Sequence, residues 1–187
     1  MMSLIKYTFI AYFKPLCFSI ILLSTLFLSN AHSKDFSEYD VKAVYLYNFL
    51  NFMSWPVDNQ SKLKKICVFG TNPFGGVLDK LVKSKPQKDR IVIEYLNKLE
   101  TIQDCHILFV GKSEEKLLKD IFNRLKKYSV LMVSDIPRFV YKGGMVGFTT
   151  DSERIKLKVN LKLVEEHGIK IDSNLLELST IVNKSGG

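Results

Sequence analysis

Short apolar segments bounded by polar residues or glycine set the strongest constraint on the fold. Ile66–Gly70 is continuously apolar, which is typical of a strand buried on both faces of a parallel sheet. Further strands are predicted at 90–95, 105–110 and 129–134. Apolar residues at helical spacing follow the first and third strands and predict a helix after each. The order strand, helix, strand, strand, helix, strand predicts an α/β layer fold with right-handed crossovers.

The pattern changes after residue 144. Met145–Thr150 reads as a strand, and Arg154–Asn160 alternates charged with apolar residues. Strict alternation predicts an edge strand, antiparallel to the one before it. We therefore expect one Rossmann-like domain with a mostly parallel sheet, helices on both faces and an antiparallel edge hairpin near the C-terminus.

Two short helices are predicted to end the chain. The first spans 161–167 and is closed by Gly168. The second is capped by Asp172 or Ser173, and its apolar positions extend to Val182.

The segment from Asp40 to Pro56 is predicted to form a long amphipathic helix packed on the sheet. Ser37 and Asp40 resemble a capping box at its start, and Pro56 is expected to end it. The predicted buried face consists of positions spaced three and four residues apart: Val41, Val44, Tyr45, Asn48, Phe49 and Phe52.

Residues 1–31 have the pattern of a signal peptide. Lys6 and Lys14 precede an apolar run from Leu16 to Leu28, and Ser29 and Ala31 occupy the small-residue positions of a cleavage site. We expect cleavage before His32 and a mature domain of residues 32–187 in the periplasm. An uncleaved N-terminal anchor is the alternative.

The charge balance is basic. Removal of Lys6 and Lys14 lowers the formal charge from +8 to +6, and the remaining lysines are scattered. Scattered lysines on an exported chain do not indicate nucleic-acid binding. A negatively charged partner surface or a lipid headgroup stays open.

Two cysteines, Cys67 and Cys105, remain after cleavage. If their strands are parallel neighbours, the spacing of about 5 Å allows a disulfide, whereas side chains on opposite faces would be free thiols. The sequence leaves both open. No Cys-x-x-Cys or His-x-x-x-His spacing occurs, so we predict no metal site.

Catalytic and cofactor motifs are weak. The turn from Gly70 to Gly76 matches neither dinucleotide-binding nor P-loop spacing, and we interpret it as a tight turn in which Asn72 caps the next helix. His106 is expected to be a core histidine, and Ser134 with Asp135 to cap a turn. We therefore predict no catalytic residue and no cofactor.

Seven segments together resemble the YfiR family, which carries the domain of unknown function DUF4154. They occur in family order and are distributed along nearly the whole of residues 32–187: 41–56, 66–75, 105–114, 130–136, 143–148, 154–161 and 168–179. The first of them reads VKAVYLYNFLNFMSWP and the last reads GIKIDSNLLELS.

The resemblance implies a periplasmic α/β protein that acts by binding. Some members repress a membrane-bound diguanylate cyclase through its periplasmic sensor domain, and an outer-membrane lipoprotein sequesters the repressor. Such members tend to form homodimers. This chain departs from the better-known repressor because no cysteine follows Cys105.

Candidate contact residues follow from these patterns. Tyr39 and Tyr47 are expected to be exposed aromatics of the opening helix, Trp55 lies at its end, and Phe139 lies in the loop 135–141. Burial in the core is the alternative for each of them, and for Trp55 it is the expectation. Residues that match the family segments and that we expect to border a polar ligand pocket are Arg154, Asn160, Lys170 and Asn174. The alternative function is a small-molecule sensor that binds at the switch point of the sheet. A hydrolase or redox enzyme is the third hypothesis.

Overall fold

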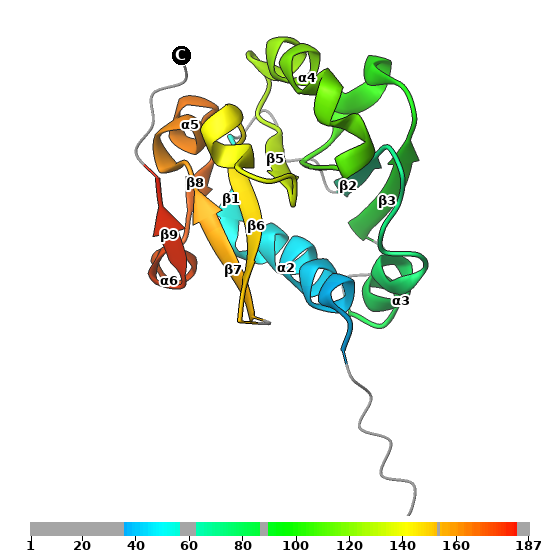
Figure 1. The fold of residues 1–187 in the computed structure, drawn as a ribbon. Coiled ribbons are helices and arrows are strands. Elements are labelled where there is room, and N and C mark those ends of the chain that lie inside the picture. The colour runs from blue at the N-terminus through cyan, green and yellow to red at the C-terminus, as the bar shows by residue number, and fades with distance from the viewer. Residues whose placement is uncertain (1–35, 57–62, 87–89, 153, 183–187) are drawn as a thin grey trace, which may run out of the picture. The chain divides into compact units, whose positions relative to one another are not determined.

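A seven-stranded sheet organises residues 36–187 (Figure 1). The computed structural model describes residues 36–56, 63–86, 90–152 and 154–182, so the predicted signal peptide lies outside the described residues. The strands are β2 (Lys64–Phe69), β3 (Ile91–Leu96), β4 (Ile107–Val110), β5 (Leu131–Ser134), β6 (Val146–Asp151), β7 (Arg154–Val159) and β9 (Ser179–Ile181).

The strand order is β3-β2-β4-β5-β6-β7-β9, and each neighbouring pair is parallel except β6–β7. The predicted α/β fold, with a mostly parallel sheet and an antiparallel hairpin, is confirmed. One detail is wrong, because β7 is not the edge strand. Leu157 to Val159 pair with Ser179 to Ile181, so β9 covers the outer side of the hairpin.

Helix α2 spans Glu38–Phe52 and starts with the predicted capping box. It ends four residues before Pro56, because Met53–Ser54 forms strand β1, which pairs with β8 (Lys170–Ile171). Its buried residues are Lys42, Ala43, Leu46, Tyr47 and Phe49, whereas Val44 is exposed. The predicted face is therefore wrong in part, since α2 is apolar nearly all round and the pattern does not single out one face.

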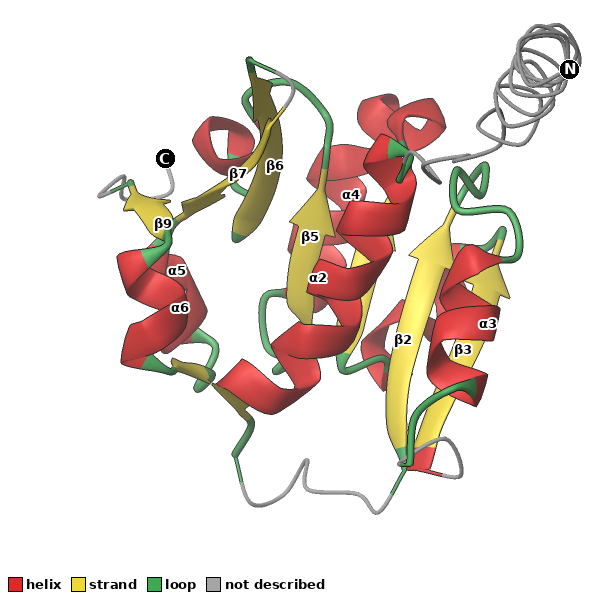
Figure 2. Ribbon diagram, turned by 90° about the horizontal axis from the view of Figure 1, so that it is seen from below, coloured by secondary structure: helices red, strands yellow, loops and turns green. Residues whose placement is uncertain are grey.

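Helices cover both faces of the sheet, as predicted. α2 and α3 (Val77–Lys83) lie on one face, and α4 (Leu118–Leu125) lies on the other (Figures 1 and 2). The remaining helices are α5 (Leu161–Glu166), α6 (Ser173–Glu177) and the 3-10 helices η3 (Leu99–Asp104), η4 (Lys112–Leu117) and η5 (Phe139–Lys142).

Two predicted helix boundaries are wrong. Asn72 does not cap a helix: its Oδ1 accepts from the Phe74 backbone and its amide donates to the Gly75 carbonyl, so a turn precedes α3. The last helix ends at Glu177, and the apolar residues after it extend into β9.

A disulfide joins Cys67 and Cys105, with a Cα–Cα distance of 6.0 Å. The strands β2 and β4 are parallel neighbours, but Cys67 pairs in register with Leu108. Cys105 instead ends the connection through η3, just before β4. The bond therefore ties this connection to the face of β2. Among the described residues, no helix is long and apolar enough to cross a bilayer.

Reduction of this disulfide is expected to destabilise the domain. The two cysteines are 38 residues apart, and a loop of that length corresponds to about 3–4 kcal/mol of unfolding free energy. Urea unfolding with and without a thiol reductant measures the effect. A Cys67→Ser/Cys105→Ser variant should be as unstable as the reduced protein and insensitive to reductant; equal stability of the oxidised and reduced proteins would contradict the prediction.

Candidate functional site

A buried ion pair joins α2 to the carboxyl end of β5. The Lys42 side chain is 1% exposed, and its Nζ lies 2.5 Å from Asp135 Oδ2 and 2.5 Å from Glu38 Oε1. The Tyr39 hydroxyl donates to the same Asp135 oxygen at 2.9 Å. Lys112 Nζ lies 3.4 Å from it. Asp135 therefore gathers two cations and a hydroxyl at one buried oxygen, and it does not merely cap a turn.

This cluster shifts the pKa values of its members. Burial raises the pKa of the Asp135 carboxyl, but Lys42, Tyr39 and Lys112 together outweigh burial, so the pKa lies below its usual value. The pKa of Tyr39 rises to about 12, because the ring is desolvated and its hydroxyl donates to Asp135. The ionised carboxylate is thus the form that stabilises the fold.

The switch point of the sheet lies between the carboxyl ends of β2 and β4, where an α/β fold ordinarily binds ligands. Here η4 side chains occupy it. Thr71 N donates to Ser113 Oγ at 3.0 Å, and a Cβ added at Gly70 would lie 2.4 Å from Glu114 Cγ. The Ser113 hydroxyl is used for this contact, and η4 begins without a side-chain cap. The geometry therefore does not favour a sensor site at this place.

The polar residues weighed as catalytic candidates serve the fold. His106 is buried and its Nδ1 accepts from the Lys65 backbone at 3.2 Å, which confirms a core histidine. Ser134 Oγ donates to the Val110 carbonyl at 2.7 Å and accepts from Ile136 N. Across the described ranges, no three His, Cys, Asp or Glu side chains gather as a metal site requires.

Most of the predicted aromatic contact residues are packed inside. Tyr47 is 8% exposed, so its predicted exposure is wrong, and Lys85 Nζ lies 5.6 Å from its ring. Trp55 is buried against His106, with ring centroids 5.7 Å apart. Phe139 is also buried, while Tyr39 is half-buried. These rings mainly build the core.

The predicted polar residues lie on different elements. Asn160 is buried and caps α5, since its Oδ1 accepts from Leu163 N at 3.2 Å. Arg154, Lys170 and Asn174 are exposed, in β7, β8 and α6 respectively. A contact role for these three stays a prediction.

The loop 135–141 does present an exposed surface, but not through Phe139. We call Pro137, Arg138, Tyr141 and Lys158 the loop surface. Tyr141 is 37% exposed, and its ring centroid lies 5.8 Å from Arg138 Cζ and 5.6 Å from Lys158 Nζ. The sequence did not identify Lys158 as a contact residue. It meets Tyr141 only because the strand register places β7 next to η5.

Arg138 has a left-handed backbone, with φ 60° and ψ 26°. This conformation costs a non-glycine residue about 1–2 kcal/mol and persists only where the surroundings fix it. Phe139 and Val140 are buried directly after it, and Tyr141 N donates to the Arg138 carbonyl at 2.9 Å. The loop surface is therefore a rigid platform, held from behind by core residues.

Removal of Lys42 is expected to unfold the domain more easily. A Lys42→Met variant leaves the Asp135 carboxylate buried without its main cation, at a cost of about 3–5 kcal/mol of unfolding free energy. A Lys42→Met/Asp135→Asn variant should lose less than the sum of the two single changes, which denaturant unfolding measures. Additive losses would contradict a coupled pair.

The same pair predicts acid sensitivity. Because the pKa of folded Asp135 lies below its unfolded value, its stabilisation is complete above the unfolded pKa of about 4 and is lost as pH falls through the folded pKa. Unfolding free energy should therefore fall below about pH 4 more steeply in the wild type than in the Lys42→Met/Asp135→Asn variant. Parallel pH profiles would contradict this assignment.

A comparison with known protein families matches residues 39–180 to DUF4154, described as YfiR/HmsC-like. A search of curated proteins finds no match. The matched range begins in α2 and ends in β9, so it includes the disulfide, the ion pair and the loop surface. The chain therefore belongs to the DUF4154 family of YfiR/HmsC-like proteins, and membership implies a regulatory role in cyclic-di-GMP signalling.

Proposed function

We propose that this protein is a periplasmic, non-enzymatic regulator that represses cyclic-di-GMP synthesis. It binds the periplasmic sensor domain of a membrane diguanylate cyclase. The family match over residues 39–180 is the observation that carries this proposal. By the same resemblance, the protein forms a homodimer, and an outer-membrane lipoprotein sequesters it.

The compartment is supported by two independent features. Residues 1–31 have a signal-peptide pattern, and Cys67 is bonded to Cys105. Structural disulfides form and persist in oxidising compartments such as the periplasm. Both features agree with an exported regulator.

Binding, rather than turnover, is supported by how the polar side chains are used. His106, Ser134 and Asp135 are all buried and hydrogen-bonded within the fold. A group that acts on a substrate needs geometric access to the reacting atoms. Their hydrogen bonds instead connect neighbouring strands of the sheet to one another and to α2.

The loop surface is the part of the chain best suited to a protein partner. It combines an aromatic ring with two cations on a rigid platform, and Tyr and Arg are enriched among the residues that dominate binding energy. The mature chain, with a formal charge of +6 after removal of Lys6 and Lys14, would be attracted to an acidic partner surface. The proposed partner therefore presents acidic residues to Arg138 and Lys158.

Deletion of the gene in the native bacterium should raise intracellular cyclic-di-GMP. The full-length chain should restore the low level, whereas a chain lacking residues 1–31 should not, because it stays in the cytoplasm. Quantification of the nucleotide by mass spectrometry under several growth conditions is the measurement. An unchanged level in the deletion strain would sink the repressor proposal.

An Arg138→Gly change separates binding from folding. Glycine adopts the left-handed conformation without strain, so thermal stability should stay equal or rise, while capture of the cyclase sensor domain should weaken about tenfold. Tyr141→Ala should weaken capture similarly. Tyr128→Ala is the matched control, because Tyr128 is 46% exposed but lies outside the loop surface. Equal capture by all three variants would rule out the loop surface as the interface.

A further inference from the structure

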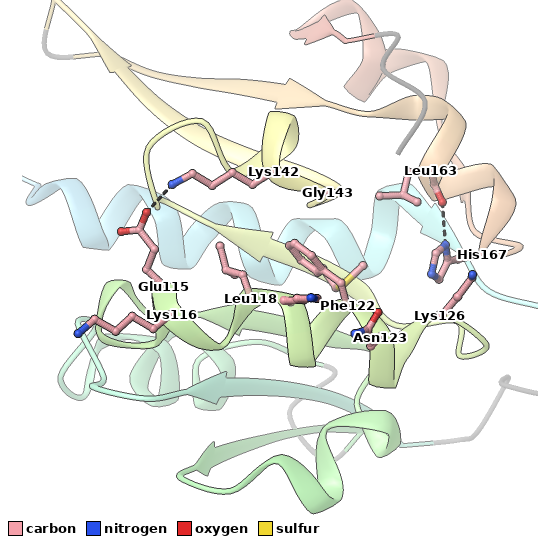
Figure 3. A pocket seen from close by; sticks show the side chains of 12 residues that line it. Glu115, Lys116, Leu118, Phe122, Asn123, Lys126, Lys142, Gly143, Leu163 and His167 are labelled. Atoms are coloured by element: carbon pink, nitrogen blue, oxygen red, sulfur yellow. Dashed lines mark hydrogen bonds and ion pairs between the residues drawn. The ribbon is translucent and has the colours of Figure 1, made fainter. Parts of the chain in front are cut away.

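A groove of about 690 Å³ lies between α4 and the segments η5 and α5 (Figure 3). This volume falls within the range of small-molecule sites. The lining residues come from η4, α4, β5, η5 and α5 and the residues that directly follow them: Glu115, Lys116, Leu118, Lys119, Phe122, Asn123, Lys126, Met132, Lys142, Gly143, Leu163 and His167. None of the contact residues predicted from the sequence is among them.

The groove lies beside a weakly paired part of the sheet, between β5 and β6. Only two residue pairs, Val133–Val146 and Ser134–Gly147, join these strands. Ahead of them, Met132 N donates to the Met145 sulfur at 3.5 Å instead of to a β6 carbonyl. Met132 is the residue of β5 that lines the groove.

One part of the lining is apolar. Leu118, Phe122, Met132 and Leu163 contribute side chains from three different elements. Gly143 has φ +110°, and a Cβ added there would lie 3.2 Å from the Phe122 ring. Glycine at this position therefore lets the backbone after η5 close over that ring.

The rest of the lining is strongly cationic. Four lysines line the groove against one acidic residue, Glu115, which pairs with Lys142. Within the described part of the chain, no carboxylate forms an ion pair with Lys116, Lys119 or Lys126. An anion that enters the groove meets a net positive field.

A buried polar atom adds a directional contact. His167 Nδ1 lies 2.9 Å from the Leu163 carbonyl, which can only accept, so Nδ1 carries the proton. Nε2 of the same ring is buried and has no hydrogen-bond partner in the described chain. Buried polar atoms are ordinarily satisfied, so this one requires an explanation. Figure 3 shows the ring at one end of the groove, beside Lys126.

We propose that this groove binds a small organic anion with an apolar body, either a carboxylate or a phosphate monoester. The charged group lies near Lys126 and the apolar body covers Phe122 and Met132. A hydroxyl next to the charged group, where the ligand carries one, donates to His167 Nε2. The assignment rests on the groove alone and does not depend on the cyclase partner.

The wild-type protein can test this with four matched probes. The probes are 3-phenylpropionate, phenyl phosphate, the neutral amide 3-phenylpropanamide and acetate, and the ¹³C-methyl signal of Met132 reports binding from inside the groove. Both aromatic anions should shift this signal, and the amide and acetate should bind about tenfold more weakly. The anion that binds more tightly shows whether the groove prefers a carboxylate or a phosphate. Equal binding of the amide and 3-phenylpropionate, or no shift with either anion, would overturn the proposal.

Variants then test the individual contacts. Lys126→Glu should weaken binding of the better anion about tenfold, whereas Lys127→Glu, an exposed neighbour that does not line the groove, should leave it unchanged. His167→Gln keeps an acceptor and should retain most of the affinity for a probe with a hydroxyl next to its carboxylate, such as 3-phenyllactate, while His167→Leu should lose that affinity. Equal affinities of the Lys126→Glu and Lys127→Glu variants would overturn the assignment.

Discussion

The fold depends on strands that are buried on both faces. Every residue of β4 and of β5 is buried, so each face of the sheet needs a helical layer. The crossover helices supply part of this cover, and α2, which precedes all strands of the sheet, supplies the rest. Its position brings the Lys42 ammonium into a dry layer, where a lone charge would cost several kcal/mol. Asp135 at the end of β5 neutralises this charge. The packing of α2 on the sheet therefore requires a carboxylate at the carboxyl end of β5.

The surfaces left for function lie where the regular pairing ends. β5 and β6 share only two residue pairs, and the chain between them, residues 135–145, must turn back over the sheet. That segment supplies Asp135 to the ion pair, Arg138 and Tyr141 to the loop surface, and Lys142 to the groove. This weakly paired connection thus contributes to the ion pair and to both proposed surfaces, as expected for loops positioned by a rigid scaffold.

The sequence predicted the parts of this structure that depend on local apolar runs. The strands around Ile66 and Leu108 were recognisable because buried parallel strands are apolar throughout. The buried face of α2 was not recognisable in the sequence. Val44 and Leu46 are both apolar, and only tertiary packing buries Leu46 and exposes Val44. β9 has three residues, too few to show a period, so its Ile181 read as a continuation of α6. The groove escaped prediction altogether, since Lys126, Met132 and His167 meet only through the topology.

The two proposed surfaces share η5, and this sets a condition on how they interact. Lys142 and Gly143 line the groove, while Tyr141, the residue before them, belongs to the loop surface. An anion changes partner affinity only if its own affinity differs between the free and the partner-bound protein, and by linkage the two effects are equal. Buried Phe139 and Val140 anchor η5 in the core, so a ligand that leaves them in place acts on the partner through its charge. An anion near Lys126 would then lower the positive potential that an acidic partner senses, and the coupling should weaken with added salt.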